Sequence, residues 1–310
     1  MIIRRIAQST GLNADYLRKV VRSASHRYKI YNIPKKTGGL REIAHPAAEL
    51  KLLQRWLVNN IFSLLPVHET VYSYREGIGI QDLAKNHNKN KYLLRIDFAD
   101  FFPSIKGHDI EKLLDKNAIY LPFALSKNDI STIKSIVCKD GCLTIGAPSS
   151  PAITNAILFD FDLLCHSKAI SQKVVYTRYS DDIYYSTNKP DLLNIIYNEF
   201  KNDLKLIKSP KLKINDKKTV FSSMKNKRIV TGLMLTSEKS ISVGRAKKRY
   251  IKSLIHKFVE GNLMEIDLSY LMGYLAYTKA VEPIFLKRLS DKYGKKVIQD
   301  IFKANIVSRK

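Results

Sequence analysis

Three aspartates lie at positions where the chain could gather a cluster of negative charge. Asp97 directly follows the short apolar segment 92–96, and Asp181 and Asp182 lie in the middle of 174–187, which reads VVYTRYSDDIYYST. Both segments are rich in β-branched and aromatic residues, so we expect a strand that ends at Asp97 and a hairpin with two carboxylates at its tip. Carboxylates in apolar strands are costly unless they are paired or bind a cation.

Hard oxygen ligands of this kind suit Mg²⁺, which usually takes one or two carboxylates together with substrate phosphates. Two such ions could activate a 3′-hydroxyl and stabilise a leaving pyrophosphate in an in-line displacement. The alternative interpretation of an Asp-Asp pair is a solvated turn. The aromatic flanks argue against that alternative. We therefore take Asp97, Asp181 and Asp182 as candidate catalytic residues that bind two Mg²⁺ ions.

The charge balance is strongly basic, with 53 Lys and Arg against 28 Asp and Glu in 310 residues. Such an excess predicts a polyanionic partner, either nucleic acid or an anionic membrane surface. No run approaches the roughly 18 apolar residues of a spanning helix, and the N-terminus lacks the features of a signal peptide. The three cysteines form neither a disulfide framework nor a zinc motif. We expect a cytoplasmic, nucleic-acid-binding protein with no membrane role.

Periodicity and turn residues predict the elements that position these acids. Residues 2–25 resemble either a helix-turn-helix or a helical hairpin packed on the body, with Asn13 as N-cap, and the second is favoured. Ser150 and Pro151 open a helix that runs to about residue 168. The other expected elements are a hairpin over 28–44, helices over 47–65 and 191–207, short strands over 211–235 and a basic helical region from 245.

Five motifs occur in the order of the palm motifs of reverse transcriptases: RIDFADFF, IGAPSSP, YSDD, KINDKKT and VTGLML. From about residue 12 to its C-terminal end the chain most resembles the bacterial retron reverse transcriptases. The resemblance implies an α+β right-hand polymerase fold, with fingers and a palm built on an antiparallel sheet and an all-helical thumb. We expect an N-terminal helical segment over 1–27, fingers and palm over 28–236 and a basic thumb over 237–310.

The resemblance also assigns roles at the metal site and at the sugar of the incoming nucleotide. It makes Asp97 and Asp181 the main metal ligands and Asp182 the third acid, and Phe98 would lend its backbone carbonyl. Phe102 takes the position where an aromatic ring rests against the sugar and excludes a 2′-hydroxyl. We expect the neighbouring Phe101 in the core, because adjacent strand residues face opposite sides.

Further residues are implied in binding the incoming dNTP. Gly146 lies in a loop of small residues that would let the backbone approach the nucleotide closely. The chain departs from the family at Thr144 and Ile145, where relatives carry Pro-Gln, so a polar contact there is missing or comes from backbone. Either Lys217 or Lys218 would lie near the leaving pyrophosphate. The cations expected to hold the triphosphate are Lys35, Lys36, Arg41 and Arg75.

Recognition of the cognate RNA is expected at two retron motifs and on the thumb. The first motif is Val230-Thr231-Gly232, and the second ends at His87, in an NAxxH pattern whose first position is Leu83 here. The thumb would hold RNA and the RNA–DNA duplex through phosphate contacts and shape. Its candidate contacts are Arg245, Lys248, Arg249 and Lys252.

The resemblance implies an RNA-directed DNA polymerase that copies part of its cognate noncoding RNA. Synthesis would be primed from a guanosine 2′-hydroxyl and give branched RNA-linked DNA (msDNA), in anti-phage defence with a possible toxin-like effector protein. One alternative is an intron-like or abortive-infection reverse transcriptase. We expect no maturase or endonuclease domain after the thumb, which argues against the intron type. Another alternative is a non-catalytic RNA-binding component of a defence complex, which the presence of all three acids disfavours.

Overall fold

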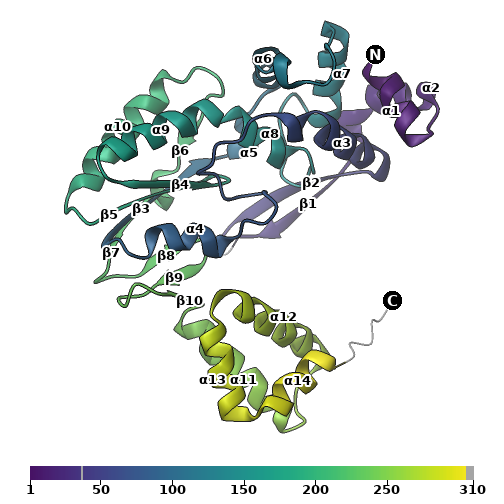
Figure 1. Cartoon of the computed structure of the whole chain (residues 1–310). Coiled ribbons are helices and arrows are strands. Elements are labelled where there is room, and N and C mark those ends of the chain that lie inside the picture. The colour runs from purple at the N-terminus through teal and green to yellow at the C-terminus, as the bar shows by residue number, and fades with distance from the viewer. Residues whose placement is uncertain (36–37, 305–310) are drawn as a thin grey trace. The chain divides into compact units, whose positions relative to one another are not determined.

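The structure is a computed structural model that describes residues 1–35 and 38–304. By contacts within the chain it divides into two compact units (Figure 1). The first unit contains Met1–Gly77 and Leu94–Phe221, and the second contains Ile78–Leu93 and Ser222–Lys310. This division differs from the expected domain boundaries, because residues 78–93 and 222–236 belong with the C-terminal helices.

The N-terminal residues form the predicted helical hairpin, α1 (Ile2–Thr10) and α2 (Ala14–Arg22). The Asn13 side chain caps α2 by accepting hydrogen bonds from two backbone N–H groups, as expected of an N-cap asparagine. Helix α2 packs against α3 (Ala48–Asn60) and α7 (Lys127–Val137). The apolar faces of these helices share one buried core with α6 (Gly107–Lys116) and α8 (Ser150–Ile157). The hairpin therefore belongs to the body of the first unit.

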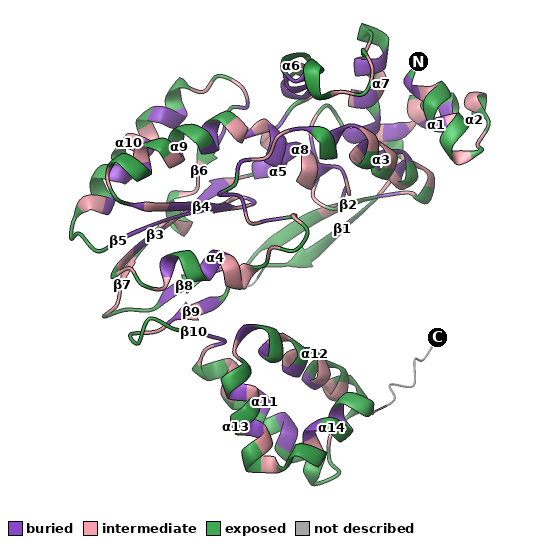
Figure 2. Cartoon of the chain, viewed as in Figure 1, coloured by how far each residue is buried: buried purple, intermediate pink, exposed green. Residues whose placement is uncertain are grey.

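The fingers contain an antiparallel ribbon of β1 (Tyr28–Pro34) and β2 (Leu40–Pro46), as predicted. Figure 2 shows that most of this ribbon is exposed, in contrast to β3 (Tyr92–Ala99), β4 (Val175–Tyr179) and β5 (Asp182–Thr187) of the palm. One hydrogen bond ties the ribbon to the loop before α8: the Ala44 N–H donates to the Ile145 carbonyl at 2.9 Å. The position of β2 is thus linked to the small-residue loop of the palm.

The palm is a sheet in the order β4 (Val175–Tyr179), β5 (Asp182–Thr187), β3 (Tyr92–Ala99) and β6 (Lys213–Ile214), and β7 (Val220–Ser223) also pairs with β3. Helices α9 (Phe159–Ser171) and α10 (Leu192–Leu206) cover one face of it (Figure 1). Aromatic rings fill this layer, including Phe98, Phe161, Phe200 and Tyr185.

Two details of the predicted palm were wrong. Strand β3 continues to Ala99, so Asp97 lies inside the strand rather than at its end. The helix opened by Ser150 and Pro151 stops at Ile157, and α9 begins at Phe159 after Leu158 leaves the helical backbone conformation. A short helix, α5 (Phe101–Ser104), follows β3.

The second unit combines α4 (Ile80–His87) with a small sheet in the order β10 (Ile241–Ser242), β9 (Leu233–Leu235), β8 (Arg228–Val230). Helix α4 packs against all three strands. The thumb that follows is all-helical, as predicted: α11 (Arg245–Val259), α12 (Glu265–Val281), α13 (Pro283–Tyr293) and α14 (Lys295–Lys303). Within residues 1–35 and 38–304, no helix has the length and apolar character needed to cross a bilayer.

Candidate active site

The hairpin of β4 and β5 carries two of the three aspartates at its turn. Tyr179 pairs with Asp182, so Ser180 and Asp181 form a two-residue loop between the strands. The backbone N–H of Phe98 on β3 donates to the carbonyl of Asp181 at 3.1 Å. The turn is therefore joined to the strand that holds Asp97, and the predicted juxtaposition of the strands is confirmed.

The charges of these aspartates disfavour one another. Burial and then the charge of Asp97 raise the pKa of Asp181. Burial and then the charge of Asp181 raise the pKa of Asp182 to about 6. Buried carboxylates that repel each other are stabilised in their ionised form by a cation placed between them. The site thus has the electrostatics of a cation-binding cluster.

Lys218 supplies one positive charge at this cluster. Its Nζ lies 3.0 and 3.1 Å from the two carboxylate oxygens of Asp97. The backbone holds the same region, because the Asn215 N–H donates to the Asp97 carbonyl at 2.8 Å. Of the two lysines that the sequence left open, Lys218 is the one that contacts a candidate metal ligand, while Lys217 is exposed in the same turn.

The donor set fits Mg²⁺ held by two carboxylates and completed by substrate. Asp97 and Asp181 offer carboxylates from neighbouring strands, which matches the usual number for Mg²⁺. Asp182 has two further partners: its carboxylate accepts from the Tyr184 hydroxyl at 3.3 Å and lies 4.0 Å from Arg95 Nε. In the part of the chain that the structure describes, no three His, Cys, Asp or Glu side chains form a ready-made metal cage.

The expected triphosphate cations differ in how they are placed. Arg41 on β2 lies near enough to Asp181 for its charge to lower the pKa of that carboxyl, against the larger effect of burial. Lys35 is exposed at the end of the ribbon, and Lys36 lies outside the described residues. Arg75 Nη1 instead donates to the carbonyls of Glu69 and Val71, at 3.1 and 3.0 Å, and so stabilises its own loop.

Phe101 and Phe102 occupy different environments, although the reason given for this from sequence was wrong. Strand β3 ends at Ala99, and both rings belong to helix α5, so strand alternation does not separate them. Phe101 is buried and stacks on Phe98 with 5.7 Å between ring centroids. Phe102 is half-buried and packs edge-on against Phe101.

Gly146 is explained by a contact with the fingers. Its φ is +109°, and a Cβ at this position would lie 2.9 Å from the Ala44 carbonyl oxygen and 3.0 Å from Ile43 Cγ2. The absence of a side chain at Gly146 therefore lets β2 approach the loop closely. The close approach of a nucleotide to this loop stays a prediction.

Val230-Thr231-Gly232 forms a tight turn. Val230 is buried and pairs with Leu233, which leaves Thr231 and Gly232 as a two-residue loop between β8 and β9. Both loop residues have positive φ, 46° and 83°. This is the requirement of a type I′ turn, which favours glycine at its second position. The sequence segment singled out for RNA recognition is thus the tip of a hairpin in the second unit.

Of the residues expected to contact RNA, His87 is buried and Lys248 is held in an ion pair. His87 is fully buried in α4, and this burial lowers its pKa to about 3, so the imidazole is neutral and inside the unit. Lys248 Nζ lies 2.5 Å from Glu282 Oε1 within the thumb. The remaining expected cations of α11 are exposed: Arg245, Arg249 and Lys252.

The sequence analysis missed a buried ion pair next to the catalytic turn. Arg178 and Asp162 have fully buried side chains, and their charged groups are 2.7 Å apart. A signal was present, because an arginine inside the apolar segment VVYTRYSDD is costly unless it is paired. Arg95, whose charge acts on Asp182, was missed as well.

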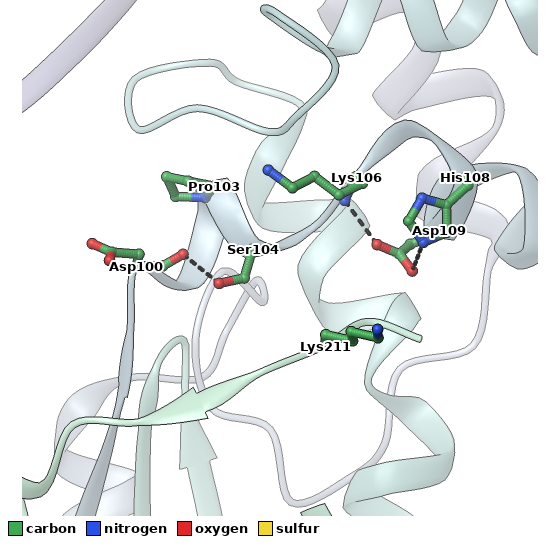
Figure 3. Close-up of a pocket in the computed structure, with 7 residues that line it drawn as sticks. All are labelled: Asp100, Pro103, Ser104, Lys106, His108, Asp109 and Lys211. Atoms are coloured by element: carbon green, nitrogen blue, oxygen red, sulfur yellow. Dashed lines mark hydrogen bonds and ion pairs between the residues drawn. The ribbon is translucent and has the colours of Figure 1, made fainter. Parts of the chain in front are cut away.

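A shallow depression of about 380 Å³ lies beyond the end of β3 (Figure 3). One of its carboxylates already has partners: Asp109 accepts from the Lys106 N–H at 2.8 Å and lies 3.1 Å from His108 Nε2. None of the three site aspartates lines it. The lining residues are Asp100, Pro103, Ser104, Lys106, His108, Asp109 and Lys211.

The palm is an antiparallel sheet with carboxylates on adjacent strands, the fingers bring an arginine near them, and the thumb is helical. These features together define a nucleic-acid polymerase of the right-hand type. The family model for reverse transcriptase (RNA-dependent DNA polymerase) matches residues 33–258. The chain belongs to the reverse transcriptase family, and it is an RNA-directed DNA polymerase of the retron type. The retron type follows from two relatives that are both retron reverse transcriptases.

The retron Ec83 reverse transcriptase of Escherichia coli is 36% identical over 295 residues, which cover 91% of each chain. The retron Ec73 reverse transcriptase of Escherichia coli is 36% identical over 301 residues, covering 94% of this chain and 95% of the relative. Among solved structures, apo telomerase from Candida tropicalis matches with a TM-score of 0.54 at 13% identity. That match covers 90% of this chain and 62% of the telomerase chain, and it shows the shared fold alone.

Proposed function

We propose that the enzyme copies part of its cognate noncoding RNA into DNA, beginning at a guanosine 2′-hydroxyl of that RNA. The product is msDNA, a branched molecule in which single-stranded DNA remains joined to RNA. Template, enzyme and dNTPs meet in the cytoplasm. The observation that carries the proposal is the catalytic turn: Asp181 is hydrogen-bonded to the strand of Asp97, inside a chain that is related to retron reverse transcriptases over nine tenths of its length.

In this proposal Asp97 and Asp181 hold Mg²⁺, with Asp182 and the Phe98 carbonyl as further oxygen donors. Two bound Mg²⁺ ions would supply activation of the attacking hydroxyl and stabilisation of the leaving pyrophosphate. Arg41 and Lys35 bind triphosphate oxygens, and Arg41 can grip them in a bidentate manner.

Lys218 neutralises part of the Asp97 charge, and it would also lie near the leaving pyrophosphate. Its contact with both Asp97 oxygens supports this assignment over Lys217. The Lys218 side chain is 40% exposed and that of Asp97 only 8%, so the ammonium can leave this carboxylate only where another cation compensates its charge.

The proposed assignment is tested by primer extension with Mg²⁺ and by a gel-shift with RNA. Asp181→Ala should lower the rate of DNA synthesis by roughly three or more orders of magnitude, because a metal site is lost, while RNA binding changes little. The matched control is Asp115→Ala, which removes an exposed carboxylate on α6 of the same unit. Extension by Asp181→Ala at the rate of this control would show that the site is assigned to the wrong residues.

The proposed product is tested in cells that contain the protein and its neighbouring noncoding RNA. Sequencing of copurified nucleic acid should find DNA joined to an internal guanosine of RNA, and a debranching enzyme should release it. Only linear DNA would favour an intron-like or abortive-infection reverse transcriptase. We place the enzyme in anti-phage defence with an effector protein, which phage challenge of cells with and without Asp181→Ala would test.

A further inference from the structure

The turn before the two aspartates is held in a strained backbone conformation. Ser180 has a φ of +57° in the two-residue loop between β4 and β5. A two-residue hairpin with positive φ at its first loop residue ordinarily carries glycine there. A residue with a side chain persists in this conformation only where its surroundings over-determine it.

Both backbone groups of Ser180 have buried partners. Its N–H donates to Ser73 Oγ at 2.8 Å, and its carbonyl accepts from Arg178 Nη1 at 3.1 Å. The next carbonyl, that of Asp181, accepts from the Phe98 N–H. Successive peptide groups at the turn are thus fixed by Ser73 and Phe98 from outside the hairpin and by Arg178 of β4, and their position sets the direction of the Asp181 side chain.

Asp162 on α9 orients the guanidinium that holds the turn. Arg178 Nε lies 2.8 Å from Asp162 Oδ1, and Nη2 lies 2.7 Å from Oδ2, so the pair is bidentate. The Tyr176 hydroxyl donates to the same carboxylate at 2.6 Å. With Nε and Nη2 engaged by Asp162, Nη1 is directed at the Ser180 carbonyl.

Asn155 on α8 completes the arrangement on the side of Ser73. Its Nδ2 donates to the Ser73 carbonyl at 2.9 Å, and its Oδ1 lies 3.4 Å from Arg178 Nη1. The backbone of Arg178 also pairs with this segment, since its N–H donates to the Thr70 carbonyl and its carbonyl accepts from Tyr72. Residues 70–73, α8, α9 and β4 therefore meet around one guanidinium.

Stability alone does not explain a buried ion pair at this place. Replacement of such a pair by well-packed apolar residues is often neutral or stabilising. An apolar pair could fill the same volume, but it could not donate a hydrogen bond to the Ser180 carbonyl. Only the charged pair supplies a hydrogen-bond donor that is fixed in position at the Ser180 carbonyl.

We propose that Arg178 and Asp162 are positioning residues that, together with Ser73, hold the Ser180 peptide so that the Asp181 carboxylate points at the metal. The proposal rests on the role of Asp181 given above. Arg178 and Asp162 act through the backbone of the turn and touch neither substrate nor metal.

The first test separates positioning from stability. The triple variant Asp162→Leu, Tyr176→Phe and Arg178→Met replaces the ion pair by apolar residues and leaves no tyrosine hydroxyl without an acceptor. We expect a melting temperature near that of the wild type and an unchanged Kd for primed template. The kcat should fall at least tenfold, and the Mg²⁺ concentration for half-maximal rate should rise. Wild-type kcat in the folded triple variant would overturn the proposal.

The second test removes one hydrogen bond and decides the matter if the triple variant does not fold. Ser73→Ala deletes the Oγ that accepts the Ser180 N–H. Its control, Ser126→Ala, deletes an Oγ that accepts the Asp129 N–H at the start of α7 in the same unit. We expect Ser73→Ala to lower kcat several-fold with little change in the KM for dNTP. A kcat equal to that of Ser126→Ala would contradict a positioning role.

These outcomes are distinguishable from a failure of the proposed active site. If Asp181→Ala retains activity, the metal assignment itself is wrong. If Asp181→Ala is inactive while both Ser73→Ala and the triple variant turn over normally, only the positioning role is overturned.

Discussion

Phe102 is half-buried beside a fully buried neighbour, which leaves one ring of the pair within reach of a ligand. We predict that Phe102→Ala raises incorporation of ribonucleotides relative to deoxynucleotides, because space opens beside C2′ of the incoming sugar. The measurement is the ratio of kcat/KM values for the two nucleotides, since discrimination is a difference between transition-state affinities. Phe101→Ala is the comparison, and it should cost stability rather than selectivity. An unchanged ratio in a folded Phe102→Ala would place the selection elsewhere.

His87 gives the stability a defined dependence on pH. Burial lowers its pKa to about 3, whereas the unfolded imidazole takes up a proton near pH 6.5. Between these values the unfolded state binds more protons, so the free energy of unfolding falls as pH falls, by up to about 1.4 kcal/mol per pH unit. Above pH 6.5 the imidazole is unprotonated in both states, so the neutral His87 no longer makes the free energy of unfolding depend on pH.

Urea unfolding at pH 7 and pH 5 measures this dependence. We predict that His87→Gln has a shallower pH slope than the wild type, because the group that resists protonation is gone. His108→Gln, which changes an exposed histidine, is the control. Equal slopes in His87→Gln and the wild type would contradict the prediction.

That Asp97 and the Asp181 turn lie on neighbouring strands could be predicted, because apolar neighbours make an unpaired carboxylate costly. The contact of Gly146 with β2 could not be predicted: a motif marks the glycine, but only coordinates show that Ala44, a hundred residues earlier, lies against it. The partners of Arg178 could not be predicted either. Apart from Ser180, they lie on three segments that meet Arg178 only in the folded chain.

At the scale of elements, the geometry of the β8–β9 turn explains why a glycine follows Thr231. Glycine at φ +83° is needed by the turn itself, and a Cβ there would meet no atom within 4 Å. We predict that Gly232→Ala strains the turn and lowers branched-product formation in cells, while extension of a supplied primer on generic RNA is largely kept. An uncharged turn acts on RNA through shape rather than through bulk charge.

Gly232→Asn is the matched variant, because asparagine tolerates the left-handed conformation that alanine resists. It should retain more branched product than Gly232→Ala. Equal losses in the cellular assay and in generic extension would mean that the turn only supports the fold of its own unit.

Helix and strand positions in the palm were largely predictable, since the periods of apolar residues and the turn residues are local signals. The residues at which the chain passes from one unit to the other could not be predicted from such local signals. Helix α4 lies more than 130 residues before the strands against which it packs, and no pattern in its own sequence indicates those strands. Long-range packing of this kind leaves little trace in local pattern.

For the whole molecule, the excess of positive charge predicts binding that weakens steeply as salt rises. Each exposed cation that meets a phosphate should contribute about one to the slope of log K against log salt. We predict that Arg245→Gln, Arg249→Gln and Lys252→Gln together reduce this slope by about three. Lys248→Gln is the control: its ion pair with Glu282 lies within the thumb, so the melting temperature should fall while the slope stays. A reduced slope in Lys248→Gln would show that its ammonium reaches RNA.

The second unit is assembled from two stretches of chain, 78–93 and 222 onward, with the palm strands between them. Leu83, Ala84 and His87 of the early stretch are buried there. A recombination event that exchanged only the C-terminal stretch between two relatives would leave α4 facing foreign strands. Exchange of the hairpin and thumb between relatives therefore requires α4 to change together with them. Chimaeras that receive both stretches should fold. Chimaeras that receive only the C-terminal stretch should leave the buried face of α4 exposed to solvent.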